Sequence, residues 1–599
     1  MIFPERKING CSKCLFDSIH NSVTIQGPHS SSALFGNSSY ISWVQTITQL
    51  ASLIPIMKKI ILLFYLSAPI FAQTKSDLSG AANLFDLTFT PQEIDTLYSD
   101  VVDNLANYKA MHGLSLNNNV PLSLWQNPKL PGMKFDQTQR PVVWPNVRAT
   151  LPKNRNDLAF YSIDQLAYLI KTKQISSVAL TEFFIARIKA HGPSLQCVIS
   201  VQEEIALGQA RQADKEISVG KYRGLLHGIP YGLKDLFAVK GTKTTWGAAP
   251  YKDQVIDEDA YVYTKLKEAG AVLVAKFTLG ALAMGDYWYG GRTKNPWNLN
   301  VGSSGSSAGS ASATVAGLVP FAIGTETWGS IVSPATTCGA TGLRPTFGSI
   351  SRSGAMALSY SLDKVGPICR SANDAAIVFH YLHGSDGKDL AAVNMPFNYQ
   401  ANRSVKGMKI GYAKNYFDKI TDTTRNEWKV LADLKKQGVQ LIPVEFPDEK
   451  AYPFNIMDVV IGAECAAQFD EFTRKNIDDQ LTRQTKNDWP NQFRTARFVP
   501  AVEYINAQRH RYLLMQKVNE VISQFDAIIC PSRGGGNQSA ITNLTGHPVV
   551  CVPTGFDVKT NLPTGISFVG RLYDEGTILR IANFYQEHTG HEELHPKGF

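Results

Sequence analysis

The sequence predicts an α/β protein with a large, mixed, mostly parallel and twisted β-sheet covered by helices on both faces, preceded by a helical and extended segment. Two observations support this prediction. From about residue 162 onward, short apolar runs alternate with segments of helical periodicity, which is typical of a sheet enclosed by two helical layers. The chain also has 599 residues with a hydrophobic content of 44%, enough to bury one large core or two ordinary ones.

The first 72 residues differ in composition from the rest. Residues 1–56 are rich in Ser and Asn and weakly patterned, and we interpret them as a disordered, non-native upstream extension before a true start at Met57. Residues 57–72 contain Lys58 and Lys59, a short apolar run and small residues up to Ala72, the pattern of a secretory signal peptide. The run is shorter than the roughly 20 apolar residues that span a bilayer. We therefore expect export to the periplasm or the extracellular space, without stable membrane insertion after the signal is removed.

Residues 73–156 are predicted to form an N-terminal helical and extended segment that wraps over the main domain. Thr90 and Pro91 mark the start of a helix that runs to about Met111, because proline is favoured in the first helical turn. The stretch after this helix is rich in Pro and Asn, which favours extended chain over regular structure.

The main domain is predicted to span residues 157–599. Ser162 and Gln165 have the spacing of a capping box and begin one helix, and a second helix runs from about 178 to 190 and ends before Gly192. A helix at about 261–269 precedes a buried strand over 271–275. Further strands are expected at 408–412, 440–444, 527–530, 548–552 and 566–569.

The stretch 302–312 consists of Gly and Ser apart from two Ala. A flexible linker is one interpretation, but this stretch continues directly into apolar sequence, and a phosphate-binding loop would need a Gly-Lys-Ser/Thr ending that is absent. We therefore predict a closely packed backbone that directs hydroxyls and N–H groups into one enclosed site. A hydroxyl there needs a base to act as a nucleophile. Lys234 would more often be a snorkelling surface residue, but burial would lower its pKa and make it that base.

The sequence resembles the amidase signature family. Residues 305–310 are similar to the family's Gly-Ser-Ser-Gly-Gly-Ser segment, and residues 324–334 to its Gly-Thr-Asp-x-Gly-Gly-Ser-Ile-Arg-x-Pro segment. The likeness covers about 162–599 and is loose only from about 387 to 525. Further motifs lie in the family's order along the chain: His227-Gly228-Ile229-Pro230 with Lys234-Asp235, Asn295-Pro296-Trp297, Cys338-Gly339, Gly342-Leu343-Arg344-Pro345, Val365-Gly366-Pro367 and Asn543-Leu544-Thr545-Gly546-His547-Pro548.

The resemblance implies the family's fold and a Ser–cis-Ser–Lys triad, a lysine-based relative of the Ser-His-Asp design. Carried over by motif, Ser330 would be the nucleophile, Ser306 the bridging serine on a cis peptide bond, and Lys234 the base. Ser307 would add a supporting hydrogen bond. The implied activity is that of an amidase, which hydrolyses linear amides through a serine acyl-enzyme without a metal or an organic cofactor.

The resemblance also implies that the oxyanion is held by the backbone N–H groups of Thr327, Trp328, Gly329 and Ser330. The chain departs from the family pattern at two positions, which we take as substrate-pocket candidates. Trp328 replaces a Gly or Ala, and Val332 replaces an Arg that would be a natural partner for a substrate carboxylate. We therefore expect a neutral or apolar acyl group.

Three functions agree with these features. The expected binding partner is a substrate, a small-molecule or peptide amide. The first is an exported amidase. The second is the glutaminase subunit of a tRNA-dependent amidotransferase; the signal-like segment, Val332 and the absence of a basic face speak against it. The scattered basic residues also speak against nucleic-acid binding. The third is an inactive binding protein on the same fold, which Trp328 and Val332 motivate although the triad residues are intact. A homodimer is left open.

Overall fold

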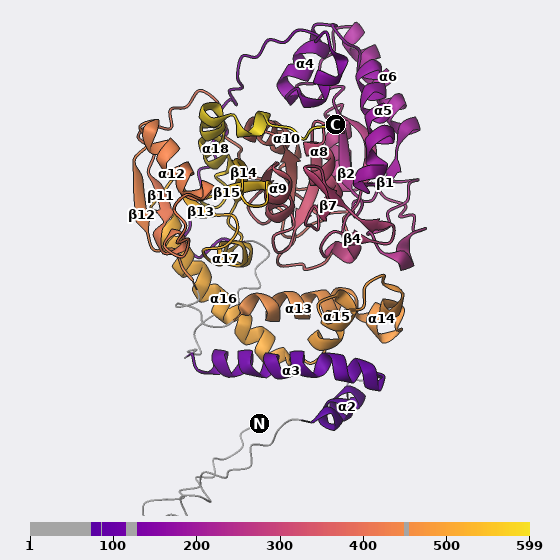
Figure 1. Cartoon of the computed structure of the whole chain (residues 1–599), viewed down its shortest axis with the longest axis vertical. Helices are drawn as coiled ribbons and strands as arrows, with labels where there is room; N and C mark the ends of the chain where they lie inside the picture. Colours follow the sequence, from indigo (N-terminus) through magenta and orange to yellow (C-terminus); the bar gives the residue numbers. More distant parts are fainter. Residues whose placement is uncertain (1–73, 85–86, 115–127, 449–454) are drawn as a thin grey trace, which may run out of the picture. The chain divides into compact units, whose positions relative to one another are not determined.

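The computed structural model describes residues 74–84, 87–114, 128–448 and 455–599. The predicted upstream extension and signal peptide lie outside these residues. Within them the chain forms one α/β unit, in which an eleven-stranded sheet is covered by helices on both faces (Figure 1). This architecture confirms the predicted fold class. None of the described helices combines the length and the apolar composition needed to cross a membrane.

The strands of the sheet confirm the elements predicted around 271–275 and in the C-terminal third of the chain. Their order across the sheet differs from their order in the sequence, so the two halves of the chain meet between β9 and β14. In spatial order the strands are β1 (Val198–Val201), β3 (Val272–Phe277), β2 (Pro230–Lys234), β8 (Ala322–Glu326), β10 (Lys364–Cys369), β9 (Thr341–Arg344), β14 (Val549–Phe556), β15 (Pro563–Val569), β13 (Ala527–Pro531), β11 (Ile410–Ala413) and β12 (Leu441–Val444).

The sheet is mixed, as predicted, but it is not mostly parallel. Among the described strands, the pairs β3–β2, β2–β8, β13–β11 and β11–β12 are parallel, and the other neighbouring pairs are antiparallel. Only residues 557–562 separate β14 from β15, and a parallel crossover needs a dozen residues or more. Apolar runs predict where strands lie but not their direction, which the length of the connection sets here.

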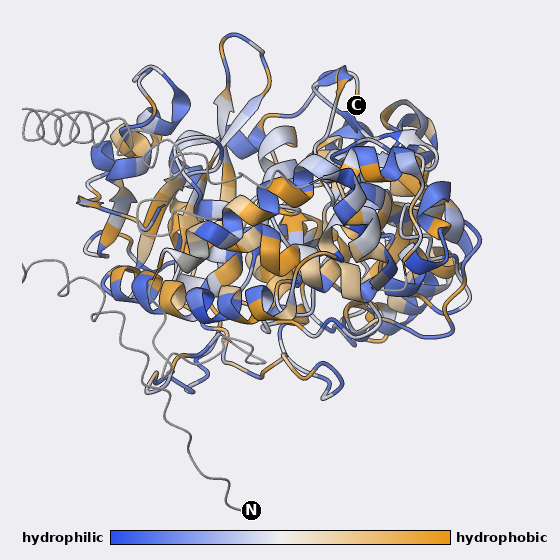
Figure 2. Ribbon diagram, turned by 90° about the horizontal axis from the view of Figure 1, so that it is seen from below, coloured by the Kyte–Doolittle hydropathy of each residue, from blue (hydrophilic) through white to orange (hydrophobic). Residues whose placement is uncertain are grey.

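Alternate residues of one strand face different helical layers, because successive side chains of a strand point to opposite faces. On β14, Val550 and Val552 belong to one hydrophobic cluster with residues of α10 and α18, whereas Val549 and Cys551 belong to a second cluster with residues of α9 and α16. Figure 2 shows the hydrophobic residues gathered on the strands and the inner sides of the helices. The four helices are α10 (Ala372–Leu382), α18 (Glu575–Thr589), α9 (Val332–Cys338) and α16 (Ala501–Ile522).

Helix α5 (Ser177–Leu195) is longer than the predicted helix over 178–190. It continues through Gly192 because that glycine is needed for close packing: a Cβ there would lie 2.9 Å from Cγ2 of Val198. Leu195 is fully buried, and the helix ends at Gln196, whose φ of 48° is left-handed. Sequence periodicity does not reveal this contact of Gly192 with β1, and a glycine in the sequence is therefore not a certain helix end.

A layer of helices lies at one end of the sheet, at the bottom of Figure 1. The helix predicted from Pro91 is confirmed and belongs to this layer. On this helix Leu97 is fully buried, and Glu93 forms an ion pair of 2.8 Å with Arg494. The extended chain after this helix touches the main domain through a bridge between Val143 and Gln400. The layer comprises α2 (Lys75–Leu84), α3 (Pro91–His112), α13 (Ile456–Gln468), α14 (Asp470–Arg474), α15 (Trp489–Ala496) and α16.

Candidate active site

The predicted base lies at the carboxyl end of β2, between the two parallel strands β3 and β8. Lys234 is completely buried, and its Nζ lies 2.8 Å from Ser306 Oγ, 3.2 Å from Ser307 Oγ and 2.9 Å from Thr325 Oγ1. Burial lowers the pKa of Lys234 to about 7, although two nearby carboxylates raise it. A substantial fraction of this lysine is therefore neutral at physiological pH and able to accept a proton.

A second buried lysine supports the strand that carries Lys234. Lys276 on β3 has its Nζ 2.9 Å from Asp235 Oδ1, and both side chains are fully buried. The other carboxylate oxygen of Asp235 accepts hydrogen bonds from the N–H and the hydroxyl of Thr245, at 2.8 Å and 2.5 Å. Lys276 thus compensates the charge of Asp235. Sequence reasoning missed this pair; a lysine inside an otherwise apolar strand is the signal that could have found it.

The Gly/Ser-rich stretch is closely packed, as its composition predicts. The peptide bond between Gly305 and Ser306 is cis, in agreement with the resemblance. A Cβ on Gly305 would lie 1.9 Å from the carbonyl oxygen of Gly285, and one on Gly309 would lie 2.4 Å from that of Cys197. Only glycine fits at these positions. The serines between them lie at the start of α8 (Ala308–Val315), where the hydroxyl of Ser306 meets the lysine.

The predicted nucleophile lies in the turn that joins β8 to α9. Ser330 is almost buried, and its carbonyl oxygen accepts a hydrogen bond of 3.1 Å from the N–H of Ser307. Its neighbour Gly329 has a φ of +86°, a left-handed conformation that glycine adopts without strain. Among the described residues, no hydrogen bond joins the hydroxyls of Ser306 and Ser330. The structure therefore brings the three predicted triad residues to one place and forms the lysine–serine link, but not the serine–serine link.

The backbone around Ser330 presents several unused donors. In the described structure, the N–H groups of Thr327, Trp328, Gly329 and Ser330 have no hydrogen-bond acceptor. These are the four groups that the resemblance assigns to oxyanion binding. Because an unsatisfied N–H cluster attracts negative charge, this turn can hold an oxyanion beside the Ser330 hydroxyl.

A buried carboxylate holds the turn in place. Glu326 Oε2 accepts the N–H groups of Ile331 and Val332 at 2.8 Å and 2.9 Å. Its Oε1 lies 2.9 Å from Arg344 Nη1 and 2.7 Å from Asn543 Nδ2, on α17 (Gln538–Thr545). The pKa of Glu326 is lowered to about 2, because the cation and these hydrogen bonds outweigh the desolvation by burial. All of these side chains belong to motifs quoted for the resemblance, but their roles appear only when the strands are assembled.

The two substrate-pocket candidates differ in position. Trp328 is 42% exposed and lies at the rim of the turn. Val332 is only 3% exposed and packs in the core with Ile331 and Ala335, because α9 begins here and turns this side toward the sheet. The side chain of Val332 is therefore part of the core in this structure.

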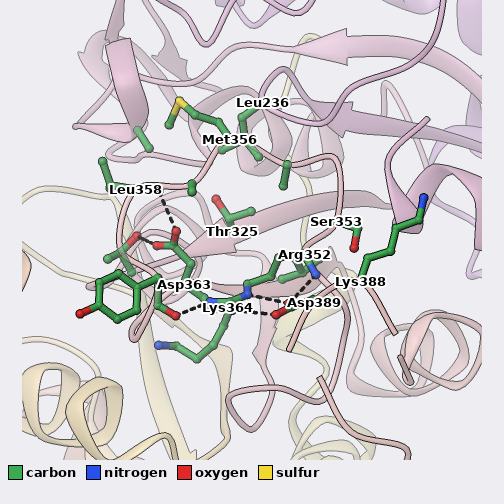
Figure 3. Close-up of a pocket in the computed structure, with 16 residues that line it drawn as sticks. Leu236, Thr325, Arg352, Ser353, Met356, Leu358, Asp363, Lys364, Lys388 and Asp389 are labelled. Carbon is green, nitrogen blue, oxygen red and sulfur yellow. Dashed lines mark hydrogen bonds and ion pairs between the residues drawn. The ribbon is translucent and has the colours of Figure 1, made fainter. Parts of the chain in front are cut away.

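A cavity of about 200 Å³ opens beside Lys234 (Figure 3). Thr325, which hydrogen-bonds the lysine, is part of its wall. In Figure 3 the apolar side chains Leu236 and Met356 lie on one side, and an ion pair of 2.7 Å between Arg352 and Asp389 lies on the other. The arginine is thus paired, and Lys364 and Lys388 also line the cavity. Its apolar side can receive an uncharged group. Thr327 and Asp363, joined by a hydrogen bond of 2.6 Å, also line it.

Comparison with known proteins agrees with this geometry. A family model described as Amidase matches residues 179–535. The chain belongs to the amidase family. It is therefore an amide-hydrolysing enzyme. In the part of this amidase that the structure describes, no group of three or more His, Cys, Asp or Glu residues is placed to hold a metal ion.

Proteins similar to this amidase include both amidotransferase subunits and a peptide amidase. It is 32% identical over 482 residues to the glutamyl-tRNA(Gln) amidotransferase A subunit of Coxiella burnetii (strain Dugway 5J108-111), an alignment that covers 73% of this chain and 99% of the relative. Native peptide amidase from Stenotrophomonas maltophilia is similar in structure, with a TM-score of 0.63, 27% identity and coverage of 72% of this chain and 97% of its own. The glutamyl-tRNA(Gln) amidotransferase A subunit of Thermotoga maritima has a TM-score of 0.60, 27% identity and coverage of 74% and 98%.

Proposed function

We propose that this amidase hydrolyses a carboxylic amide through a covalent intermediate on Ser330, with Ser306 and Lys234 as a proton relay. The observation that carries the proposal is the contact of 2.8 Å between Lys234 Nζ and Ser306 Oγ inside a completely buried site. A lysine whose pKa is lowered to about 7 is neutral often enough to take a proton from this serine.

The steps follow from this arrangement. Lys234 accepts the proton of Ser306, which takes the proton of Ser330 as Ser330 Oγ bonds to the amide carbon. The oxyanion is bound by the free N–H groups of the turn, and one such donor is worth about 3 kcal/mol. Collapse breaks the C–N bond, and the relay returns a proton to the amine. Water then cleaves the acyl ester by the same route.

The missing serine–serine hydrogen bond does not oppose this proposal. Catalytic hydrogen bonds are often long or misaligned before substrate binds. The proposal requires the Ser330 hydroxyl to turn toward Ser306 about χ1, a change between staggered rotamers.

We propose further that the acyl group is neutral or apolar and occupies the cavity beside Lys234. Leu236, Met356 and Leu358 provide apolar surface there, and the guanidinium of Arg352 is paired with a carboxylate. Of the other cations that line this cavity, Lys364 is buried and has its pKa lowered well below the usual value by desolvation, and Lys388 is exposed, where water screens its charge.

The test is labelling of the purified protein by a fluorophosphonate probe, which reacts with activated serines. Wild-type protein should be labelled, and Ser330→Ala should not be. Ser312→Ala is a matched control, because this serine lies in the same Gly/Ser-rich stretch but donates only to the carbonyl of Lys294, at 2.8 Å. Full labelling of Ser330→Ala would contradict the proposal.

A second candidate is the glutaminase subunit of an amidotransferase, which the similarity to the Coxiella burnetii protein favours. Purification of the tagged chain from its native cell would decide between the two. Partner subunits and tRNA that co-purify in equal amounts would support the glutaminase role, whereas an isolated chain that hydrolyses amides would support the amidase.

We also propose that the mature protein is exported, because Lys58 and Lys59 precede a short apolar run. Mass spectrometry of the native protein should find an N-terminus near Gln73. An intact Met1 in soluble cytoplasmic protein would contradict export.

A further inference from the structure

Loop 532–537 places an arginine beside the helix that follows Ser330. The loop joins β13 to α17 and contains three consecutive glycines. Nη2 of Arg533 donates to Ser333 Oγ at 3.2 Å and to the Ser333 carbonyl oxygen at 3.4 Å, and it also hydrogen-bonds to Thr337 Oγ1. Both acceptor residues belong to α9. The guanidinium is therefore fixed to the element that carries the nucleophile turn.

Ser333 connects this arginine to both serine segments of the site. The N–H of Ser333 donates to the carbonyl of Gly329 at 2.7 Å, and its hydroxyl lies 2.9 Å from the hydroxyl of Ser304. Ser304 and Gly329 are partly exposed, whereas Ser306 and Ser330, two positions and one position further along the chain, are buried. The arginine thus lies at the rim of the site and not on a distant surface.

The charge of Arg533 has no counter-ion among the residues that the structure describes, where it forms no ion pair with any carboxylate. The residue is exposed at the surface, although desolvation by its surroundings lowers its pKa. The arginines nearest the site differ in this respect, since Arg344 is paired with Glu326 and Arg352 with Asp389. Among the described contacts only Nη2 of Arg533 donates hydrogen bonds, so its other N–H groups are available. A guanidinium of this kind can bind a carboxylate through two parallel hydrogen bonds.

The contacts arrange these groups in a series across the site. From Arg533 the series passes through α9 and Ser304 to Ser306, and from there through Lys234 to Thr325, which lines the cavity. Arg533 and the cavity are the two ends of this series, and Ser306 lies between them; Ser330 directly follows Gly329, whose carbonyl accepts from the N–H of Ser333. The acyl chain and the amine of a bound amide extend from the reacting carbon in different directions. The cavity end therefore receives the acyl chain, and the Arg533 end receives the amine.

We propose that Arg533 binds a carboxylate on the leaving amine, so that the preferred substrates are N-acyl amino acids. This inference rests on the proposed function, in which the cavity takes a neutral acyl group. Water is the co-reactant: the C–N bond breaks, the acyl carbon gains the water oxygen, and the amine leaves as a free amino acid. The carboxylate that Arg533 binds is unchanged by the reaction.

The experiment compares matched substrates with wild-type enzyme and Arg533→Gln. N-octanoylglycine and N-octanoylethanolamine differ in a carboxylate on the amine side, and suberamic acid and octanamide differ in one on the acyl side. We expect wild type to prefer N-octanoylglycine, and Arg533→Gln to lower kcat/KM for it by about tenfold to a hundredfold, mostly through KM, since this is the usual strength of a hydrogen bond to a charged group. The neutral substrates should change little, and Arg533→Lys should retain part of the preference.

The control is Arg211→Gln, which removes an exposed arginine on α6 (Glu203–Ser218) and should leave all four rates unchanged. If Arg533→Gln lowers kcat/KM equally for N-octanoylglycine and N-octanoylethanolamine, the inference is overturned. Preference for suberamic acid that disappears in Arg533→Gln would also overturn it, because the carboxylate would then lie on the acyl side. If wild type hydrolyses only the neutral amides, the inference fails and the proposed function stands. If it hydrolyses none and Ser330 takes no probe, the proposed function fails as well.

Discussion

Replacing Glu326 by Gln should lower the free energy of unfolding by about 3 kcal/mol. The Glu326 carboxylate is fully buried, and its pKa is lowered from 4.5 to about 2. One pKa unit is about 1.4 kcal/mol, so ionisation of this group favours the folded state by about 3 kcal/mol at neutral pH. The substitution also leaves the buried guanidinium of Arg344 without its carboxylate, and breaking a buried ion pair costs about 3–5 kcal/mol. The two arguments give the same size of effect.

The assay is urea unfolding at several pH values. The control is Glu203→Gln, which removes the partner of Lys189 from a surface ion pair of 2.6 Å and should cost less than about 1 kcal/mol. Because the pKa of Glu326 is depressed in the folded protein, its contribution is complete above pH 4.5 and is lost as the pH falls through about 2. The difference between wild type and Glu326→Gln should therefore shrink over this range.

Two outcomes would refute the reasoning. A cost below about 1 kcal/mol at pH 7 would mean that the ion pair contributes no more than a surface pair does. A difference that stays constant from pH 4.5 to 2 would mean that Glu326 is not ionised in the folded protein.

Three further predictions concern catalysis. The kcat/KM of wild type should rise with pH through a midpoint near 7, because Lys234 must be neutral and its folded pKa is about 7; a profile that is flat from pH 5.5 to 9 would contradict this. Ser306→Ala should retain more activity than Ser330→Ala, since water can replace part of a relay but not a nucleophile; equal single-turnover rates for the two variants would argue against the relay. Trp328→Gly should raise kcat/KM for bulky amides relative to acetamide, because the exposed indole lies at the rim of the site; an unchanged ratio would place the indole outside the substrate path.

Local sequence pattern predicts part of this molecule well. The strands β3 and β13 and the helix from Pro91 follow from apolar runs and a first-turn proline, which act over a few residues. The packing of the Gly/Ser-rich stretch follows from side-chain size alone. Apolar runs do not predict whether neighbouring strands are parallel or antiparallel. The excess of antiparallel pairs shows that the length of the connection between strands must also be considered.

The candidate site divides in the same way. Motifs place Lys234 near Ser306, but pattern alone does not pair Glu326 with Arg344 or connect either to Asn543, because these residues meet only through the order of strands in the sheet. Val332 differs from its expectation: nearness to Ser330 in sequence suggests a pocket residue, but its side chain, at the first position of α9, packs into the core.

The packing of α3 has a consequence for the order in which the chain folds. Its tyrosine Tyr108 hydrogen-bonds to the carbonyl of Phe498, 390 positions later, and its Glu93 pairs with Arg494. At a synthesis rate of roughly 5–20 residues per second, the partners of this early helix emerge about 20–80 s after it. During that interval α3 can pack against α2, whose Leu78 shares a cluster with Leu97, but its contacts with α15 and α16 cannot yet form. The N-terminal helix is thus among the first segments made and among the last that can dock.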